Sequence, residues 1–161
     1  MANAGKVLAL IGAIFTILGT FFFTLVESFP GLYVYGAGGM LNIDDIFITA
    51  ASGTWQYWIV GIVTILYLIS GFIQLLGIKS RIASFLGSLL PITVAIFIIL
   101  ALAGVGATIV LYVLVLSAAP LVPNFIPVVF EYGFMDLGFG TIFIALGGLL
   151  SLVSVFMSRE D

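Results

Sequence analysis

The sequence predicts an all-α integral membrane protein: an antiparallel bundle of four transmembrane helices with a small extracellular layer that contains a β-hairpin. Of the 161 residues, 63% are hydrophobic and only 7% are charged, which is too little polar surface for a water-soluble domain. Several uncharged apolar runs also have the length of about 20 residues that an α-helix needs to cross a bilayer. Both observations indicate one four-span membrane domain over residues 1–161.

Three spans can be placed directly on the apolar runs, at about 7–26, 57–78 and 138–157. Residues 82–130, between the second and the last span, carry no charge, and they could form one very long helix or two spans. Two spans would place several prolines inside a helix, where each removes a backbone hydrogen-bond donor. We therefore expect a single third span at about 82–117, longer than a bilayer requires.

The distribution of charge also favours four spans, with both termini in the cytoplasm. All basic residues then lie on one side of the membrane, as the positive-inside rule requires. These residues are Lys6, Lys79, Arg81 and Arg159. The two outer loops, at about 27–55 and 118–137, hold acidic residues and no basic ones. We expect an integral protein of the cell membrane with an acidic outer face.

The first outer loop contains a candidate β-hairpin followed by a short helix. LYVY at 32–35 is rich in aromatic and branched residues, GAGG at 36–39 can reverse the chain, and MLNI at 40–43 can pair back. Asp44 and Asp45 then begin an amphipathic stretch, DDIFITAAS, which we expect to form a helix against the membrane surface. A calcium site at these acids is disfavoured, because Ca²⁺ takes six to eight oxygen ligands.

Aromatic side chains crowd the outer loops. Trp55, Tyr57 and Trp58 stand at the mouth of the second span, where such rings commonly anchor a protein in the membrane interface. The other rings, together with the acids, are typical of a surface that contacts a protein. The candidate contact residues are Tyr33, Tyr35, Asp44, Asp45, Phe125, Phe130, Tyr132 and Phe134.

Small residues recur every three or four positions on the first and last helices. Such stripes let helix backbones approach closely, and close packing drives helix association in lipid. The stripes comprise Gly5, Ala9, Gly12, Thr16, Thr20 and Thr24 on the first helix and Gly147, Ser151, Ser154 and Ser158 on the last. We assign them to packing within the bundle, and packing between protomers is the alternative.

The spans contain no ionisable side chain apart from tyrosine, which disfavours proton relays and ion-coupled transport. Their one strongly polar side chain is that of Gln74, which we expect to form an interhelical hydrogen bond or to lie at the inner interface. The chain has no Cys and no His, so the commonest metal ligands and the commonest general base are missing. We expect no enzyme activity, no cofactor, no metal, no small-molecule substrate and no nucleic-acid partner.

The arrangement resembles the claudin-like tetraspan (four-span) membrane protein superfamily. The shared features are inward termini, a longer first outer loop with β-character, a minimal inner loop, a shorter second outer loop and an overlong third helix. At residue level, Gly31 and Leu32 are similar to that family's Gly-Leu-Trp segment, with Tyr33 in place of Trp. The paired loop cysteines of the family are absent. The resemblance implies a fold more than a function.

Two functions remain open. The first is a non-enzymatic structural or interaction protein whose outward loops mediate self-assembly or partner contact. The second is an accessory subunit packed within a larger membrane complex. A small-solute pore is less favoured, because the spans lack a polar lining. The expected partners are the lipid bilayer and a protein, either a different one or a second copy of this chain.

Overall fold

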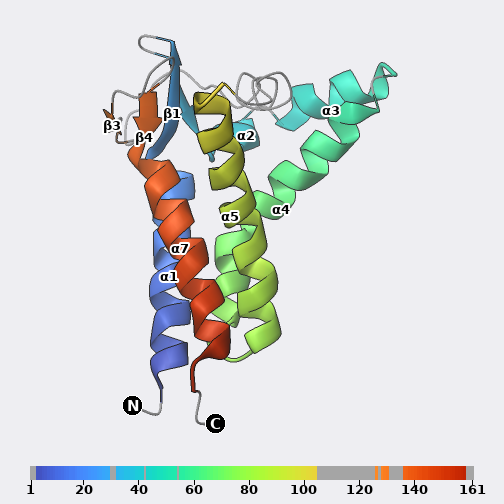
Figure 1. Ribbon diagram of the computed structural model, residues 1–161. Helices are drawn as coiled ribbons and strands as arrows, with labels where there is room; N and C mark the ends of the chain where they lie inside the picture. Colours follow the sequence, from blue (N-terminus) through green and yellow to red (C-terminus); the bar gives the residue numbers. More distant parts are fainter. Residues whose placement is uncertain are drawn as a thin grey trace.

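The computed structural model describes residues 3–29, 32–41, 43–53, 55–104, 126, 128–130 and 136–158. Four long helices form a bundle (Figure 1): α1 (Ala4–Phe21), α4 (Gln56–Leu76), α5 (Arg81–Leu102) and α7 (Phe139–Phe156). By length and apolar composition each can cross a membrane. The predicted number of long apolar helices is confirmed for the described residues, and the second and last spans begin and end within two residues of the prediction.

Both chain ends lie at one end of the bundle (Figure 1). The amide of Gly5 donates a hydrogen bond to the carbonyl oxygen of Ser158 at 3.2 Å, which joins the start of α1 to the end of α7. The short turn between α4 and α5 lies at the same end, and Ser80 caps α5 by accepting a hydrogen bond from the amide of Ala83. Lys6 and Lys79 therefore belong to the same end of the bundle.

A four-stranded antiparallel sheet forms the opposite end of the molecule. Its strands are β1 (Thr24–Phe29), β2 (Leu32–Tyr35), β3 (Val129–Phe130) and β4 (Asp136–Gly138), in the order β2-β1-β4-β3. β1 follows α1 after a short turn, and β4 leads directly into α7. The tightly packed pair of α1 and α7 therefore continues upward as the hydrogen-bonded pair of β1 and β4.

The first span is shorter than predicted. α1 ends at Phe21, whereas the apolar run suggested a helix to about residue 26. Thr24–Phe29 instead forms β1, which has a strand on each side. Branched and aromatic residues suit a pleated surface that is covered on both edges, so strand pairing replaces the last turns of the expected helix.

The third span is also shorter than predicted. α5 ends at Leu102, and Gly104 has a backbone φ of 76°, a value that a right-handed helix does not contain. One continuous helix from 82 to 117 is therefore wrong, although residues 105–117 themselves lie outside the described chain. The overlong third helix was one feature of the claudin-like resemblance.

The predicted outer hairpin exists, but with a different partner strand. LYVY forms β2, which pairs with the preceding β1 so that Glu27 lies opposite Tyr33. The residues after β2 do not pair back, because Gly38–Leu41 forms the short helix α2. A Cβ atom at Gly36 would lie 2.7 Å from the carbonyl oxygen of Thr20. This glycine therefore serves close packing on the end of α1 and not the reversal of a hairpin.

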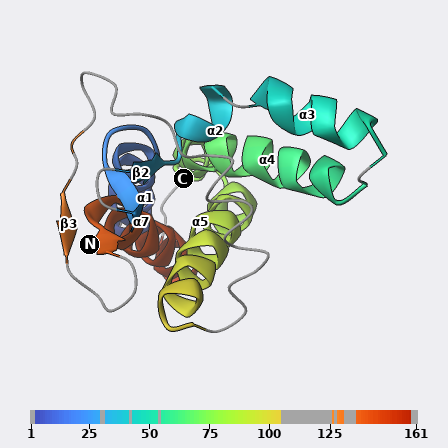
Figure 2. The same ribbon diagram turned by 90° about the horizontal axis from the view of Figure 1, so that it is seen from above.

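The predicted short helix is present as α3 (Ile43–Ala51), and it lies alongside α4 (Figure 2). The ring of Phe47 packs on the ring of Trp58 at a centroid distance of 5.4 Å and covers Gly61. Asp44 and Asp45 are exposed in the first turn of α3. Ile46 and Phe47 of α3 therefore pack on α4, whereas Ile48 is exposed. The contact of α3 with the membrane surface stays a prediction.

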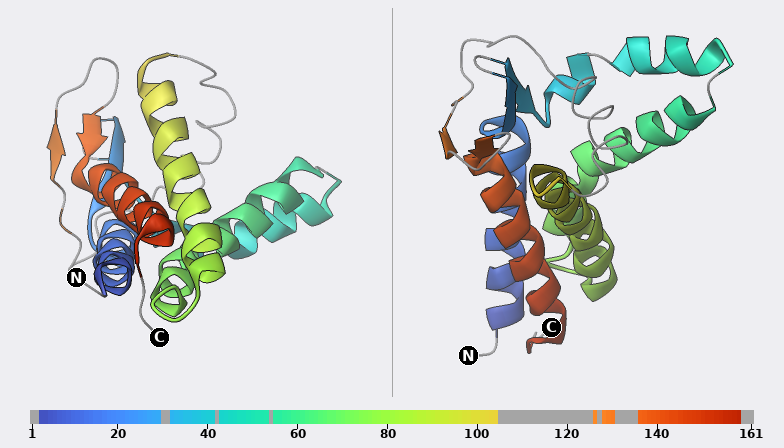
Figure 3. Two further views of the ribbon diagram at one scale, coloured as in Figure 1. Left: turned by 60° about the horizontal axis from the view of Figure 1, so that its bottom comes forward. Right: turned by 45° about the horizontal axis from the view of Figure 1, so that its top comes forward.

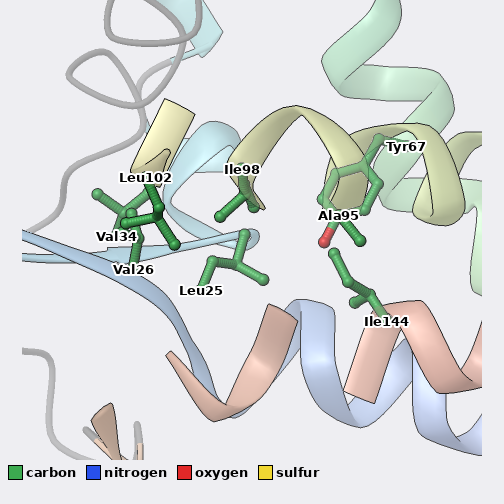
Figure 4. Packing of buried hydrophobic residues seen from close by; sticks show 8 residues of the cluster. All are labelled: Leu25, Val26, Val34, Tyr67, Ala95, Ile98, Leu102 and Ile144. Atoms are coloured by element: carbon green, nitrogen blue, oxygen red, sulfur yellow. The ribbon is translucent and has the colours of Figure 1, made fainter. Parts of the chain in front are cut away.

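The hydrophobic core lies where the sheet meets the upper halves of the helices (Figure 4). It comprises Leu25, Val26, Val34, Tyr67, Ala95, Ile98, Leu102 and Ile144. These side chains come from β1, β2, α4, α5 and α7, so one cluster joins the outer sheet to three membrane helices.

Candidate functional site

The small-residue stripes of α1 and α7 face each other. A Cβ atom at Gly12 would lie 2.6 Å from the carbonyl oxygen of Gly147 and 2.8 Å from the amide nitrogen of Ser151. Of the two predicted stripes, Thr24 lies on β1 and not on α1, and Ser158 is exposed after the end of α7. The other positions are buried: Gly5, Ala9, Gly12, Thr16, Thr20, Gly147, Ser151 and Ser154. These residues are therefore covered within one chain, and they are not a free surface for a second protomer.

Gln74 connects three helices through its side chain. The hydroxyl of Thr16 donates a hydrogen bond to Gln74 Oε1 at 3.0 Å, and Gln74 Nε2 donates to the carbonyl oxygen of Gly87 at 2.9 Å. The Gln74 side chain is fully buried. The predicted interhelical hydrogen bond is confirmed, and it ties α4 to both α1 and α5.

Further hydroxyl groups of the predicted stripes bond to side chains that the sequence analysis did not single out, those of Tyr67 and Ser84. Thr20 donates to the Tyr67 hydroxyl at 3.1 Å, and Ser154 donates to the Ser84 hydroxyl at 3.3 Å. Ser84 and Ser88 are buried on α5 together with Gly87. Their spacing of three and four residues is the same signal that identified the stripes on α1 and α7, so it could have identified this third stripe.

The outer sheet is fixed to the bundle by hydrogen bonds. The hydroxyl of Thr141 on α7 donates to the carbonyl oxygen of Leu25 on β1 at 2.6 Å. The amide of Ala37, after β2, donates to the carbonyl oxygen of Thr20 at 2.9 Å. The sheet is therefore held by the α1–α7 pair and does not depend on loop contacts alone.

Tyr35 does not lie on the surface, contrary to the prediction that it contacts a partner. Its side chain is 1% exposed, and Val34 beside it is also fully buried. Successive strand residues point to opposite faces, so both faces of β2 are covered. Burial raises the pKa of Tyr35 above its usual value of about 10, against the opposing effect of a hydrogen bond with Thr24, while nearby Tyr33 raises it further. Tyr35 is therefore a neutral core residue.

The other predicted contact residues do not form one patch. Asp44 and Asp45 are exposed on α3, Tyr33 is half-buried on β2, and Phe130 is exposed on β3. α3 and β3 lie on opposite sides of the outer end (Figures 1 and 2). The remaining three, Phe125, Tyr132 and Phe134, lie outside the described residues.

Phe130 belongs to a row of phenylalanine rings that descends along the bundle. Its ring centroid lies 6.0 Å from that of Phe139, which lies 4.8 Å from Phe143, which in turn lies 5.0 Å from Phe15. The row was not predicted, although the spacing of four residues between Phe139 and Phe143 places both rings on one helix face. The exposed ring of Phe130 is thus supported from below by α7.

The described part of the chain offers no metal-binding cluster: no three His, Cys, Asp or Glu side chains in it are grouped to hold an ion. The described outer end presents exposed aromatic rings, the edge strands of the sheet and scattered carboxylates. Comparisons with known protein families, with curated proteins and with solved structures found no match.

Proposed function

We propose that the protein is a non-enzymatic structural or interaction protein of the membrane, whose outer layer contacts a protein partner or a second copy. The observation that carries this proposal is Phe130, a large ring that is 48% exposed on the outermost strand of a firmly held sheet. Rigid, exposed aromatic side chains are the usual anchors of protein interfaces. Below the sheet, close backbone contacts and internal hydrogen bonds hold the helices together, as expected of a structural protein.

We further propose that the outer sheet faces away from the cytoplasm and that both termini are cytoplasmic, in the cell membrane. Lys6, Lys79 and Arg81 all belong to the end of the bundle that carries the termini. The positive-inside rule assigns such an end to the cytoplasm. The described acids Glu27 and Asp136 lie in the sheet, at the opposite end.

A second candidate function is that of an accessory subunit within a larger membrane complex. It is favoured by α3 and the first half of α4, which lean away from the other long helices (Figure 3). That half of α4 packs on α3 through the contact between Trp58 and Phe47. The hydrogen bond that joins α4 to α1 through Tyr67 lies one residue past the middle of α4. Trp58, Ile59 and Ile62 are exposed there, and a neighbouring subunit could cover them.

Replacing Phe130 by alanine is expected to weaken association by about tenfold or more, because an anchoring ring typically contributes ~2 kcal/mol or more to binding. The fold should be retained, since the ring lies at the surface of an edge strand. The mass of the complex in native membrane nanodiscs, compared between the parent and the variant, measures the loss.

The matched control is Ile48→Ala, which removes an apolar side chain on α3 that is 67% exposed and lies away from β3. It should assemble like the parent. If Phe130→Ala also assembles like the parent, the ring of Phe130 only anchors the protein in the membrane–water interface. The association surface must then lie along the lipid-facing helices.

A further inference from the structure

We propose that Gly87 and Pro91 of α5 together form an acceptor site for the side chain of Gln74, and that this contact is a latch that holds α4, with α3, on the rest of the bundle. Three features of these buried residues support the latch: a carbonyl group that a proline deprives of its usual donor, a glycine that lets α4 come close, and an amide bonded on both sides. The latch goes beyond the proposed function, because it acts whatever the outer end contacts.

Pro91 lies inside α5, and its side chain is fully buried. In an α-helix the amide of each residue donates to the carbonyl oxygen four residues before it, but proline has no amide hydrogen. The carbonyl group of Gly87 therefore loses the donor that position 91 would supply. Lipid offers no replacement, because the hydrocarbon core holds no water. A donor must come from another part of the protein.

Gln74 on α4 supplies this donor. Its Nε2 atom donates to the carbonyl oxygen of Gly87 at 2.9 Å, and its Oε1 atom accepts from the hydroxyl of Thr16 on α1 at 3.0 Å. The side chain is fully buried. Both polar atoms of the amide are thus paired, and the carbonyl group that Pro91 leaves open is paired with a different helix.

Glycine at position 87 makes this approach possible. A Cβ atom there would lie 2.8 Å from the amide nitrogen of Gln74, 2.9 Å from its Cγ atom and 3.0 Å from the carbonyl oxygen of Ser70. Non-bonded atoms normally stay about 3.5–4.0 Å apart, so a larger residue would push α4 away from α5. Gly87 and Pro91, four residues apart, therefore provide the space and the open carbonyl group of one acceptor site.

The latch lies in the second half of α4. Tyr67 accepts a hydrogen bond from Thr20 of α1 just past the middle of α4, and Gln74 lies about two turns further on. The first half of α4 leans away from the other long helices and packs on α3 (Figure 3). Loss of the latch should therefore loosen α3 and α4 as one unit, while α1 and α7 stay packed through their small residues.

The first test observes the Gln74 amide directly, in the full chain in phosphatidylcholine nanodiscs. The sequence has two glutamines, Gln56 and Gln74, so ¹⁵N labelling of glutamine side chains gives two pairs of amide resonances, and Gln56→Glu assigns them. Pro91→Ala supplies an intrahelical donor to the Gly87 carbonyl group, so the Gln74 proton resonance should move upfield as its hydrogen bond weakens. Leu89→Ala, an exposed neighbour on α5, should leave the resonance in place.

A double-mutant cycle then measures the coupling between the two helices. Gln74→Met keeps an unbranched side chain but removes the amide, which leaves the Gly87 carbonyl group unpaired wherever Pro91 is present. Unfolding by dodecyl sulfate in mixed micelles should show that Gln74→Met raises the unfolding constant about tenfold more in the parent than in Pro91→Ala. The lost bond with Thr16 is common to both backgrounds and cancels. In Leu89→Ala the effect should equal that in the parent.

Hydrogen exchange shows which helices the latch holds. In Gln74→Met the amides of α3 and α4 should exchange about tenfold or more faster than in the parent, whereas those of α7 should keep the parent rate. Equal acceleration in all helices, an equal effect of Gln74→Met with and without Pro91, or an unmoved Gln74 resonance in Pro91→Ala would each overturn the latch.

Gly87→Ala keeps the proposal testable if Pro91→Ala does not fold. The added Cβ atom meets Gln74, so the Gln74 resonance should move upfield and α3 and α4 should exchange faster than in the parent. A Gln74 resonance and exchange rates like those of the parent would show that Gly87 does not form the acceptor site, and the latch would be overturned.

Discussion

Leucine in place of Gly12 is expected to abolish the native packing of α1 on α7. Even a Cβ atom at this position would lie 2.6 Å and 2.8 Å from backbone atoms of Gly147 and Ser151. Backbone atoms of a helix cannot rotate away as a side chain can, so the whole interface must open. Overpacking typically costs 1–3 kcal/mol even where a core can adjust, and here we expect a loss of about 3 kcal/mol or more.

Thermal unfolding in mild detergent, followed by circular dichroism, measures this loss. Phe22→Leu is the control, because Phe22 is exposed at the end of α1 and its change should stay within about 0.5 kcal/mol. The loss of stability for Gly12→Ala should lie between those of Gly12→Leu and Phe22→Leu. Alanine favours a helix by about 1 kcal/mol over glycine, but its Cβ atom still meets the backbone of α7. Melting of Gly12→Leu at the parent temperature would mean that α1 and α7 do not meet at this glycine.

Alanine in place of Tyr35 is expected to destabilise the protein by about 3 kcal/mol, because truncating a large buried ring removes apolar burial and leaves a cavity. The side chain is 1% exposed, and it lies on a strand that is covered on both faces. The loss should appear as a lower midpoint of chemical unfolding. Association of the folded fraction should be unchanged, since Tyr35 does not reach the surface.

Tyr33→Ala is the matched control for Tyr35, two residues earlier on the same strand. Its side chain is half-buried, so the loss of stability should be clearly smaller. The opposite pattern would contradict the placement of Tyr35 in the core: unfolding of Tyr35→Ala like the parent, together with lost association, would show that this tyrosine is a surface contact.

The number of long helices and the packed sides of α1 and α7 could be predicted from the sequence, because both depend on local patterns. An uncharged run of about 20 apolar residues specifies a span by its length alone. Small residues at every third or fourth position specify which side of α1 and α7 faces another helix, and Gly12 and Ser151 are buried accordingly. A lone amide such as that of Gln74, in a run of apolar residues, predicts a hydrogen-bonded partner.

The outer sheet could be predicted only in part, because strand pairing joins residues far apart in the sequence. Thr24–Phe29 follows an apolar helix without a break in hydrophobicity, and nothing local reveals that it pairs with Asp136–Gly138. The composition of LYVY predicts a strand, but its partner strand precedes it and does not follow it. The burial of Tyr35 follows from that pairing, which explains why an exposed ring was predicted there. The claudin-like resemblance stays a prediction.

Orientation in the membrane underlies the whole functional proposal, since a contact surface on the sheet must face outward. The chain has no cysteine, so single cysteines can be introduced at Asp45 on α3 and at Lys79 in the α4–α5 turn. Both residues are exposed, and a reagent on the correct side of the membrane can reach either one.

Labelling of intact cells with a membrane-impermeant maleimide tests this orientation most directly. Asp45→Cys should react from outside, and Lys79→Cys should react only after the membrane is permeabilised. Reaction of Lys79→Cys in intact cells, with Asp45→Cys protected until permeabilisation, would place the sheet in the cytoplasm and contradict the proposed outward contact surface.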